Sequence, residues 1–167
     1  MKRFLAFLDK RLYKFLDKNC RIMPKRIVKF IAYFYTDARI RKKYLKRLNV
    51  FLGKGTYANI GFVADATEKA KVVIGKNVSI APYVSFITVS EPNNSNNLKM
   101  NKYIIKNCIK EQSIVVKDEV WIGTNVTILP GVTIGTHSVI GANSLVIEDV
   151  EPYSIYAGTP ARKIREI

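Results

Sequence analysis

A six-residue spacing of apolar residues restricts the fold of this chain more than any other feature. One apolar residue opens each hexad, and the spacing resumes after a break of about 25 residues. These first positions are Ile74, Ile80, Phe86, Val116, Ile122, Ile128, Ile134, Ile140 and Val146. The fifth position of the later hexads is small or β-branched: Val120, Val126, Val132, Ser138, Ser144 and Val150. Such a period predicts stacked rungs that bury one continuous apolar column, which no single rung can bury alone.

Glycine and asparagine punctuate the hexads. Glycine is frequent at the second position, at Gly75, Gly123, Gly135 and Gly141. These residue types supply the turning backbone that a coil needs at its corners. The sequence therefore predicts a mainly β fold, a parallel β-helix over residues 49–167. A polar excursion over about residues 88–114 interrupts it, and a short C-terminal segment follows it.

The first 48 residues have a different period and a different charge. Leu5, Leu8, Leu12 and Phe15 recur at helical spacing, which predicts amphipathic helices over residues 1–48. This segment carries sixteen Lys and Arg against three Asp, whereas residues 49–167 carry twelve against ten acidic residues. Two uses fit a basic amphipathic module with Phe4, Phe7, Phe15, Phe30 and Phe34: contact with an anionic membrane surface, and covering the open end of the β-helix. Nucleic acid is not expected as a partner, because no known motif accompanies the charge.

Several classes of protein are not expected from this sequence. The start of the chain has charged residues too early for a signal peptide, and no stretch reaches the ~20 apolar residues of a membrane span. Cys20 and Cys108 lie far apart, so free thiols in a reducing cytoplasm are expected. No cluster of His, Cys and carboxylates has metal-ligand spacing, so no metal is implied. The prediction is a cytoplasmic protein, whose basic segment gives it access to the inner membrane face.

Two segments resemble a known family, the hexapeptide-repeat acyltransferases, and especially their galactoside, maltose and polysaccharide O-acetyltransferase branch. They are Val120–Gly135, with its Trp121-Ile122-Gly123-Thr124 start, and the ending Tyr156–Arg165, with Gly158-Thr159-Pro160-Ala161. The resemblance covers about residues 57–167 and implies a left-handed β-helix of triangular coils, each of three hexads. It also implies a homotrimer with active sites between subunits. The implied activity is transfer of an acetyl group from acetyl-CoA to a hydroxyl of a sugar or polysaccharide precursor.

The resemblance also implies site residues. Those at the CoA positions of the family are Trp121, Gly123, Thr124, Ala142, Arg162 and Arg165. A guanidinium fork suits the CoA phosphates, although a solvated C-terminal strand would equally explain the two arginines. The family often has Thr-Lys where this chain has Ile147-Glu148, which removes one basic contact. Tyr57-Ala58-Asn59 matches a segment whose Asn contacts the acceptor, so Tyr57 and Asn59 are candidate acceptor ligands; Asn59 as a turn residue is the alternative.

The catalytic base is where the chain departs from the family. Related enzymes carry a His-Pro pair just before the excursion, and that His is the general base, whereas this chain has Glu91-Pro92. The only histidine, His137, occupies an outward corner position and is expected to be a surface residue. Three interpretations of Glu91 stay open. It is the catalytic base, if partial burial makes its carboxylate a stronger proton acceptor; or it marks a site that has lost catalysis; or it is a solvated loop residue.

Two further points follow from this departure. If Glu91 is only a loop residue, the polar cluster Asn93, Asn94 and Ser95 would position the acceptor, although such runs are also ordinary turn material. The competing function is a catalytically impaired trimeric protein that binds CoA or sugar as a scaffold.

Overall fold

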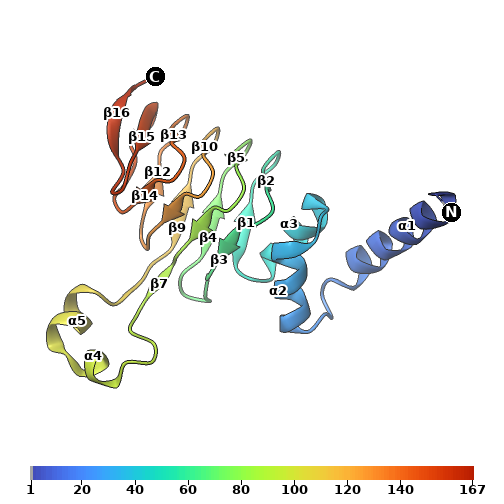
Figure 1. The fold of residues 1–167 in the computed structure, drawn as a ribbon, viewed down its shortest axis with the longest axis horizontal. Coiled ribbons are helices and arrows are strands. Elements are labelled where there is room, and N and C mark those ends of the chain that lie inside the picture. Colours follow the sequence, from blue (N-terminus) through green and yellow to red (C-terminus); the bar gives the residue numbers. More distant parts are fainter. Residues whose placement is uncertain (1) are drawn as a thin grey trace.

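Three helices precede a prism of short strands (Figure 1). The computed structural model describes residues 2–167, with side chains from Phe7 onward. The helices are α1 (Lys2–Asn19), α2 (Lys25–Phe34) and α3 (Ala38–Lys46). The strands then follow one another around three sheets, which form the three faces of the prism and are named here A, B and C.

Each sheet collects one strand from every coil. Sheet A contains β1 (Val50–Leu52), β4 (Val72–Ile74), β9 (Ile114–Val116) and β12 (Thr133–Ile134). Sheet B contains β2 (Tyr57–Ala58), β5 (Ser79–Ile80), β10 (Trp121–Ile122), β13 (Val139–Ile140), β15 (Ser154–Ala157) and β16 (Arg162–Glu166). Sheet C contains β3 (Val63–Ala64), β6 (Ser85–Phe86), β11 (Thr127–Ile128) and β14 (Leu145–Val146). Within these three sheets all pairs are parallel except β15 with β16, so the predicted parallel β-helix is confirmed.

The pairing register shows the coil length and where the chain deviates from it. Ile122 pairs with Ile140, 18 residues later, which is one coil of three hexads. The first coil is longer, since Ala64 pairs with Phe86, 22 residues later. Its four extra residues lie between β3 and β4, and they hide this coil from a search for hexads. The sequence reading accordingly found the period only from Ile74.

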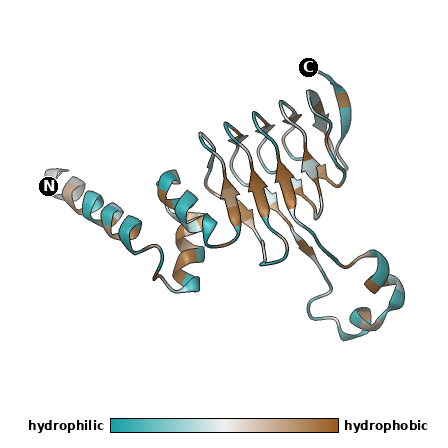
Figure 2. Cartoon of the chain, turned by 180° about the vertical axis from the view of Figure 1, so that it is seen from behind, coloured by the Kyte–Doolittle hydropathy of each residue, from teal (hydrophilic) through white to brown (hydrophobic). Residues whose placement is uncertain are grey.

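The interior of the prism is the predicted apolar column. First-position residues such as Ile122, Ile128 and Ile134 have no exposed surface. Phe62 and Phe86 fill the interior of the first two coils, with ring centroids 5.3 Å apart. Figure 2 shows the strands as the apolar part of the coils and the corners as largely hydrophilic. Burial of this column, at about 25 cal/mol per Å² of apolar surface, is the main stabilising contribution to the coils.

The corners differ from the sequence prediction in one respect. The left-handed backbone lies at the fourth position of the hexad, for example at Asn77, Asn125 and Asn143, with φ between 51° and 58°. The second-position glycines have another role, because a Cβ on Gly123 would lie 2.6 Å from the backbone nitrogen of Ala142 in the next coil. Glycine at this position therefore permits the close stacking of coils.

The polar excursion leaves the prism as an arm (Figure 1). Strands β7 (Val89–Ser90) and β8 (Lys110–Glu111) pair in antiparallel fashion at its base, and α4 (Asn96–Met100) and α5 (Lys102–Asn107) form its tip. The sequence reading expected a polar loop and no helices here. Asn101 caps α5 by accepting hydrogen bonds from the N–H groups of Tyr103 and Ile104. The tip nevertheless exposes several large apolar side chains: Leu98, Met100, Tyr103 and Ile105.

Helices α2 and α3 cover the open end of the first coil. Buried side chains of both helices, including Ile31 and Tyr44, continue the core of the prism. Arg41 donates a hydrogen bond to the carbonyl of Ala58 at 2.5 Å, and the Tyr33 hydroxyl donates to the carbonyl of Ala64 at 2.6 Å. These carbonyls have no preceding coil to pair with, so the helices satisfy a strand edge that would otherwise stay unpaired.

Helix α1 projects away from the prism (Figure 1). Its C-terminal turn packs against α3 through Leu16 and Cys20, which are buried. Large apolar side chains farther along the same helix are exposed: Phe7, Leu8, Leu12 and Phe15. The side chains of Phe4 and Leu5, which belong to the predicted stripe, lie outside the described residues. No helix in residues 2–167 is long and apolar enough to cross a bilayer.

The start of α3 gives a prediction about stability. The carboxylate of Asp37 accepts hydrogen bonds from the backbone N–H groups of Arg39 and Ile40, at 2.8 and 3.4 Å. The side-chain hydrogen bond from Arg39, followed by these backbone bonds, lowers the pKa of Asp37 to about 2. Asp37→Ala is expected to lower the free energy of unfolding by about 1 kcal/mol at pH 7. Urea unfolding of both proteins measures the difference.

The pH dependence provides the control for this prediction. Because folding depresses the Asp37 pKa from 3.8, its stabilisation is complete above about pH 4 and disappears as the pH falls toward 2. The gap between the native protein and Asp37→Ala is therefore expected to narrow between pH 4 and pH 2. A gap that stays constant over this range would show that the ionised cap does not stabilise α3.

Candidate functional site

The three edges of the prism separate the predicted site residues. In every coil the chain passes from sheet A to B, then to C, and back to A. Tyr57, Trp121 and the segment that follows each of them lie on sheet B and at the edge between B and C. The arm leaves between β6 of sheet C and β9 of sheet A, and therefore at another edge. One chain thus brings the acceptor and CoA candidates to one face but keeps Glu91 away from them.

The acceptor candidates Tyr57 and Asn59 meet in one pocket of about 320 Å³ on the outer side of sheet B. Tyr57 points outward from β2, and 45% of its surface is exposed. The Asn59 side chain donates from Nδ2 to the carbonyl of Ile80 in the next coil, at 2.7 Å. Asn59 therefore ties two coils together, as its alternative interpretation expects. Its side-chain oxygen takes no part in that bond, so it can still accept a hydrogen bond from a sugar hydroxyl.

The CoA candidates form a track farther along the same face. Trp121 points outward from β10, in line with Ser79 and Tyr57, and is 60% exposed. Thr124 and Ala142 occupy equivalent corner positions in successive coils and are both exposed. The Thr124 hydroxyl donates to the carbonyl of Pro82 at 2.9 Å. Gly123 lies beside this track, and the lack of a side chain there keeps the coils close.

The arginine candidates lie on the last strand. β16 folds back on β15, and Arg162 and Arg165 are both exposed on it. Ala161, the neighbour of Arg162, donates its N–H to Leu145, which brings this hairpin beside the end of the Thr124–Ala142 track. Arg162 lies 3.9 Å from the carboxylate of Glu148, an ion pair exposed to solvent. The acidic residue that departs from the family pattern thus competes with a phosphate for this arginine.

Glu91 is exposed at the base of the arm, directly after β7. Asn93 and Asn94 are also exposed, and Ser95 is half-buried. Backbone hydrogen bonds from Asn93 to Glu91 (2.9 Å) and from Ser95 to Pro92 (3.0 Å) fold the segment into a turn that leads into α4. These residues lie together, but within one chain nothing covers Glu91.

The contacts of His137 are with neighbouring residues of the coils. It is exposed at the fourth position of its hexad with φ 57°, and its ring stacks on Tyr153 with centroids 4.9 Å apart. Its Nδ1 lies 3.0 Å from the hydroxyl of Thr136. His137 lies at the edge between sheets A and B and does not share the pocket of Tyr57 and Asn59.

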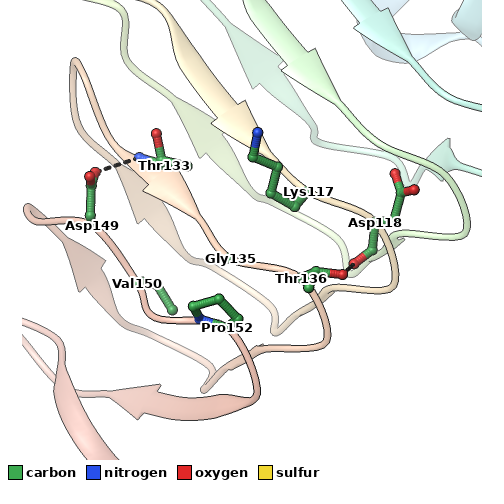
Figure 3. Close-up of a pocket in the computed structure, with 8 residues that line it drawn as sticks. All are labelled: Lys117, Asp118, Thr133, Gly135, Thr136, Asp149, Val150 and Pro152. Atoms are coloured by element: carbon green, nitrogen blue, oxygen red, sulfur yellow. Dashed lines mark hydrogen bonds between the residues drawn. The ribbon is translucent and has the colours of Figure 1, made fainter.

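A groove of about 510 Å³ between sheet A and the last coil contains none of the predicted site residues. Figure 3 shows its lining, in which the carboxylate of Asp149 accepts from the N–H of Thr133 at 2.7 Å and the Thr136 hydroxyl donates to the carbonyl of Asp118 at 2.8 Å. Because these groups hold neighbouring coils together, the groove is a product of coil stacking. In residues 2–167, no group of three or more His, Cys, Asp or Glu side chains is placed to hold a metal ion.

A second cavity was missed at the sequence level. It has a volume of about 570 Å³ and lies between α3 and the first coil, with Tyr57 as a shared wall with the acceptor pocket. Four cations line it: Arg39, Lys42, Lys43 and Lys46. Their spacing along the chain, in steps of three, one and three residues, is that of one helical face, and the sequence alone could have revealed this basic face. Only the fold shows that this face looks onto Tyr57.

Comparison with known proteins gives consistent matches. Residues 113–148 match the family model described as bacterial transferase hexapeptide (six repeats). Galactoside O-acetyltransferase of Escherichia coli K12 is 40% identical over 119 residues, which are 71% of this chain and 55% of that protein. The chain spans about half the length of the first curated relatives that it matches.

Solved structures agree over a longer range. A hexapeptide-repeat acetyltransferase from Vibrio cholerae is 30% identical with a TM-score of 0.68, over 85% of this chain and 88% of that one. A galactoside acetyltransferase in complex with coenzyme A is 28% identical with a TM-score of 0.67, over 91% and 82%. These neighbours are left-handed β-helices, and the coils of this chain share that handedness.

Proposed function

Because the chain belongs to the hexapeptide-repeat acetyltransferase family, we propose that it transfers an acetyl group from acetyl-CoA to a hydroxyl of a sugar. The observation that carries this proposal is the common face of the acceptor and CoA candidates. Tyr57 and Asn59 lie at the N-terminal end of sheet B, and Trp121, Thr124 and Ala142 follow toward its C-terminal end. An acceptor and a donor bound along this face would meet end to end.

The proposed chemistry is a single acyl transfer. The sugar oxygen attacks the thioester carbonyl carbon, the C–S bond breaks, and CoA leaves with its thiol. Glu91 would take the proton from the attacking hydroxyl and return it to the departing sulfur. Asn93, Asn94 and Ser95, which follow Glu91 in the same turn, would hydrogen-bond the acceptor hydroxyls. The basic side chains of Arg162 and Arg165 would hold the CoA phosphates.

The working form would be a homotrimer. Glu91 lies at the C–A edge and the CoA candidates lie at the B–C edge, so a neighbouring chain has to supply one of the two sets. The exposed apolar side chains on the arm, including Met100 and Tyr103, support the same proposal, since contact with a neighbour would bury them. Contact with the neighbour would also cover Glu91, as a carboxylate base requires.

Identification of the product tests the proposed transfer. The purified protein is incubated with acetyl-CoA and a panel of monosaccharides and oligosaccharides, and the masses of the products are measured by mass spectrometry. We expect at least one acceptor to gain a single acetyl group, with the linkage at oxygen. Recovery of every acceptor unmodified would contradict the proposal.

A catalytically impaired protein that binds CoA or sugar is the second candidate function. Two observations favour it: Glu91, at the family's histidine position, is exposed, and Glu148 pairs with Arg162. This candidate predicts that CoA binds but that no acceptor causes its release. The two candidates therefore differ in turnover and agree in binding.

Residues 1–48 would hold the protein at an anionic membrane surface on the cytoplasmic side, near an acceptor that is a polysaccharide precursor. The exposed Phe7, Leu8, Leu12 and Phe15 of α1, together with Phe30 and Phe34 of α2, support this role. The basic side chains of the same segment would contact anionic headgroups. The inner faces of α2 and α3 cover the prism, so both uses of this segment fit together.

Flotation with liposomes tests the membrane proposal. The native protein is expected to float with anionic vesicles at low salt, and less at 1 M salt because screening weakens the electrostatic part. Phe7→Ser with Phe15→Ser is expected to reduce binding at least tenfold, since two aromatic rings no longer enter the interface. Tyr153→Ser, at an exposed aromatic of the last coil, outside both residues 1–48 and the arm, is the matched control. No binding at either salt concentration would refute this role.

A further inference from the structure

The cavity between α3 and the first coil is basic on one side and apolar on the other. Arg39, Lys42, Lys43 and Lys46 follow one another on a single face of α3. Phe51, Leu52 and Tyr57 of β1 and β2 form the opposite wall. Among the side chains described, from Phe7 onward, no acidic one lines the cavity. A concave site with several convergent cations and a flat apolar wall has the features of a ligand site rather than a solvated charged surface.

The positive charge of this cavity is only partly compensated. Arg39 pairs with Asp37 at 2.7 Å, and Lys43 pairs with Asp17. Within residues 2–167, Lys42 and Lys46 have no carboxylate at ion-pair distance. A second basic cavity, between α1 and α3, shares two of these lysines; it is lined by Asp17, Lys18, Cys20, Arg21, Lys43, Lys46 and Arg47. The surplus of about two positive charges suits a dianion better than a single carboxylate.

Lys42 is held in place before any ligand arrives. Its ammonium group donates to the carbonyl of Gly53 and, at 3.2 Å, to the carbonyl of Thr56. It also lies 5.0 Å from the centre of the Tyr57 ring. Burial lowers the pKa of Lys42, so a neighbouring anion would stabilise its charged form. A fixed, half-buried ammonium costs little ordering entropy when it binds an anion.

The wall that this cavity shares with the acceptor pocket connects it to the reaction. Tyr57 lines both the basic cavity and the pocket that contains Asn59. The CoA candidates lie in the opposite direction along sheet B. A sugar in the pocket of Asn59 would therefore have its reacting hydroxyl toward the donor and its other end toward α3.

From this arrangement we infer that the acceptor carries a phosphate or diphosphate group, which binds between Lys42 and Lys46 while its sugar occupies the neighbouring pocket. The inference rests on the proposed transfer of acetyl to a sugar and narrows the acceptor to phosphorylated saccharides. Two sources present the same chemistry: a sugar linked to a nucleotide diphosphate and a sugar linked to a lipid diphosphate. The aromatic wall of Phe51 and Tyr57 accommodates the non-ionic part of either carrier.

Binding of inorganic pyrophosphate tests the anion site without any need for turnover. Calorimetric titrations are made with saturating CoA present, so that the donor site is already occupied. Lys46→Glu is expected to weaken pyrophosphate binding about tenfold, because the exposed side chain at this position changes from a cation that attracts pyrophosphate to an anion that repels it. Lys69→Glu makes the same charge change on an exposed lysine in the loop between β3 and β4 and is expected to change affinity less than twofold. Absence of binding, or equal losses in both variants, would overturn the inference.

Turnover distinguishes the acceptors. Thiol release is compared for one free sugar, its nucleotide diphosphate conjugate and its conjugate with a short-chain prenyl diphosphate. The inference expects kcat/KM to be at least tenfold higher for one of the conjugates, and expects this preference to fall in Lys46→Glu but not in Lys69→Glu. Equal kcat/KM for free and conjugated sugars would overturn it. If no acceptor turns over while pyrophosphate binding depends on Lys46, the transfer proposal fails and the anion site stands.

Discussion

Glu91→Gln is expected to lower the rate of acetyl transfer at least 100-fold while leaving the KM for acetyl-CoA within about twofold. Glutamine keeps the size of the side chain but cannot accept the proton of the sugar hydroxyl, and general base catalysis typically contributes 10²–10⁴-fold. Glu91 is not one of the CoA candidates, and glutamine keeps the shape of its side chain, so the substitution is expected to leave the donor contacts intact. The measurement is steady-state thiol release with the best acceptor of the panel.

Glu68→Gln is the matched control for this substitution. Glu68 is an exposed carboxylate in the loop between β3 and β4, at the same edge of the prism as the arm but outside it. Its replacement is expected to leave the rate unchanged. If Glu91→Gln also leaves the rate unchanged, Glu91 is a solvated loop residue. In that case catalysis depends on positioning by Asn93, Asn94 and Ser95.

Arg41→Met is expected to destabilise the protein by about 3 kcal/mol. Arg41 is only 3% exposed, and its guanidinium donates to the carbonyls of Tyr35, Thr36 and Ala58. Methionine fills most of the volume but leaves these acceptors without a donor, at a cost of about 1–3 kcal/mol for each that stays dry. Burial lowers the pKa of Arg41, so part of its contribution is offset by desolvation.

Thermal unfolding measures this effect. For a chain of this size, about 3 kcal/mol corresponds to a decrease in Tm of roughly 6–12 °C. Lys29→Met, an exposed position on α2, is the control and is expected to change the stability by less than about 0.5 kcal/mol. Both are compared at one protein concentration, because an oligomer's Tm depends on it. A decrease below 2 °C for Arg41→Met would show that α2 and α3 do not hold the end of the prism.

The coils were predictable because each hexad repeats the same physical requirement. An apolar residue such as Ile122 or Ile128 has to point inward at every rung, and in the later hexads the fifth position is small or β-branched, whereas Phe62 fills it in the first coil. The first coil escaped detection because a polar residue, Thr56, occupies the fifth position of its first hexad, where later hexads mostly have valine. The Thr56 hydroxyl donates a hydrogen bond to the carbonyl of Gly75 at 2.7 Å. Four extra residues after Ala64 also shift the register.

The site was less predictable because it depends on which face each residue reaches. The sequence named Tyr57, Trp121 and Thr124, and only the pairing of Tyr57 with Ser79 and of Ser79 with Trp121 in sheet B puts them on one side of the prism. Periodicity alone did not connect Lys42 with Tyr57, since α3 folds back over the first coil. The proposed role of Glu91 requires burial by another chain, and no pattern within one chain specifies such a contact.

Release of free CoA thiol from acetyl-CoA, measured with and without each acceptor of the panel, tests the proposed function most directly. The expected result is a thiol release rate that saturates with at least one saccharide and falls to background without it. The contradicting result is CoA binding by calorimetry without acceptor-dependent thiol release for any saccharide of the panel. It would show a protein that binds CoA but does not transfer the acetyl group.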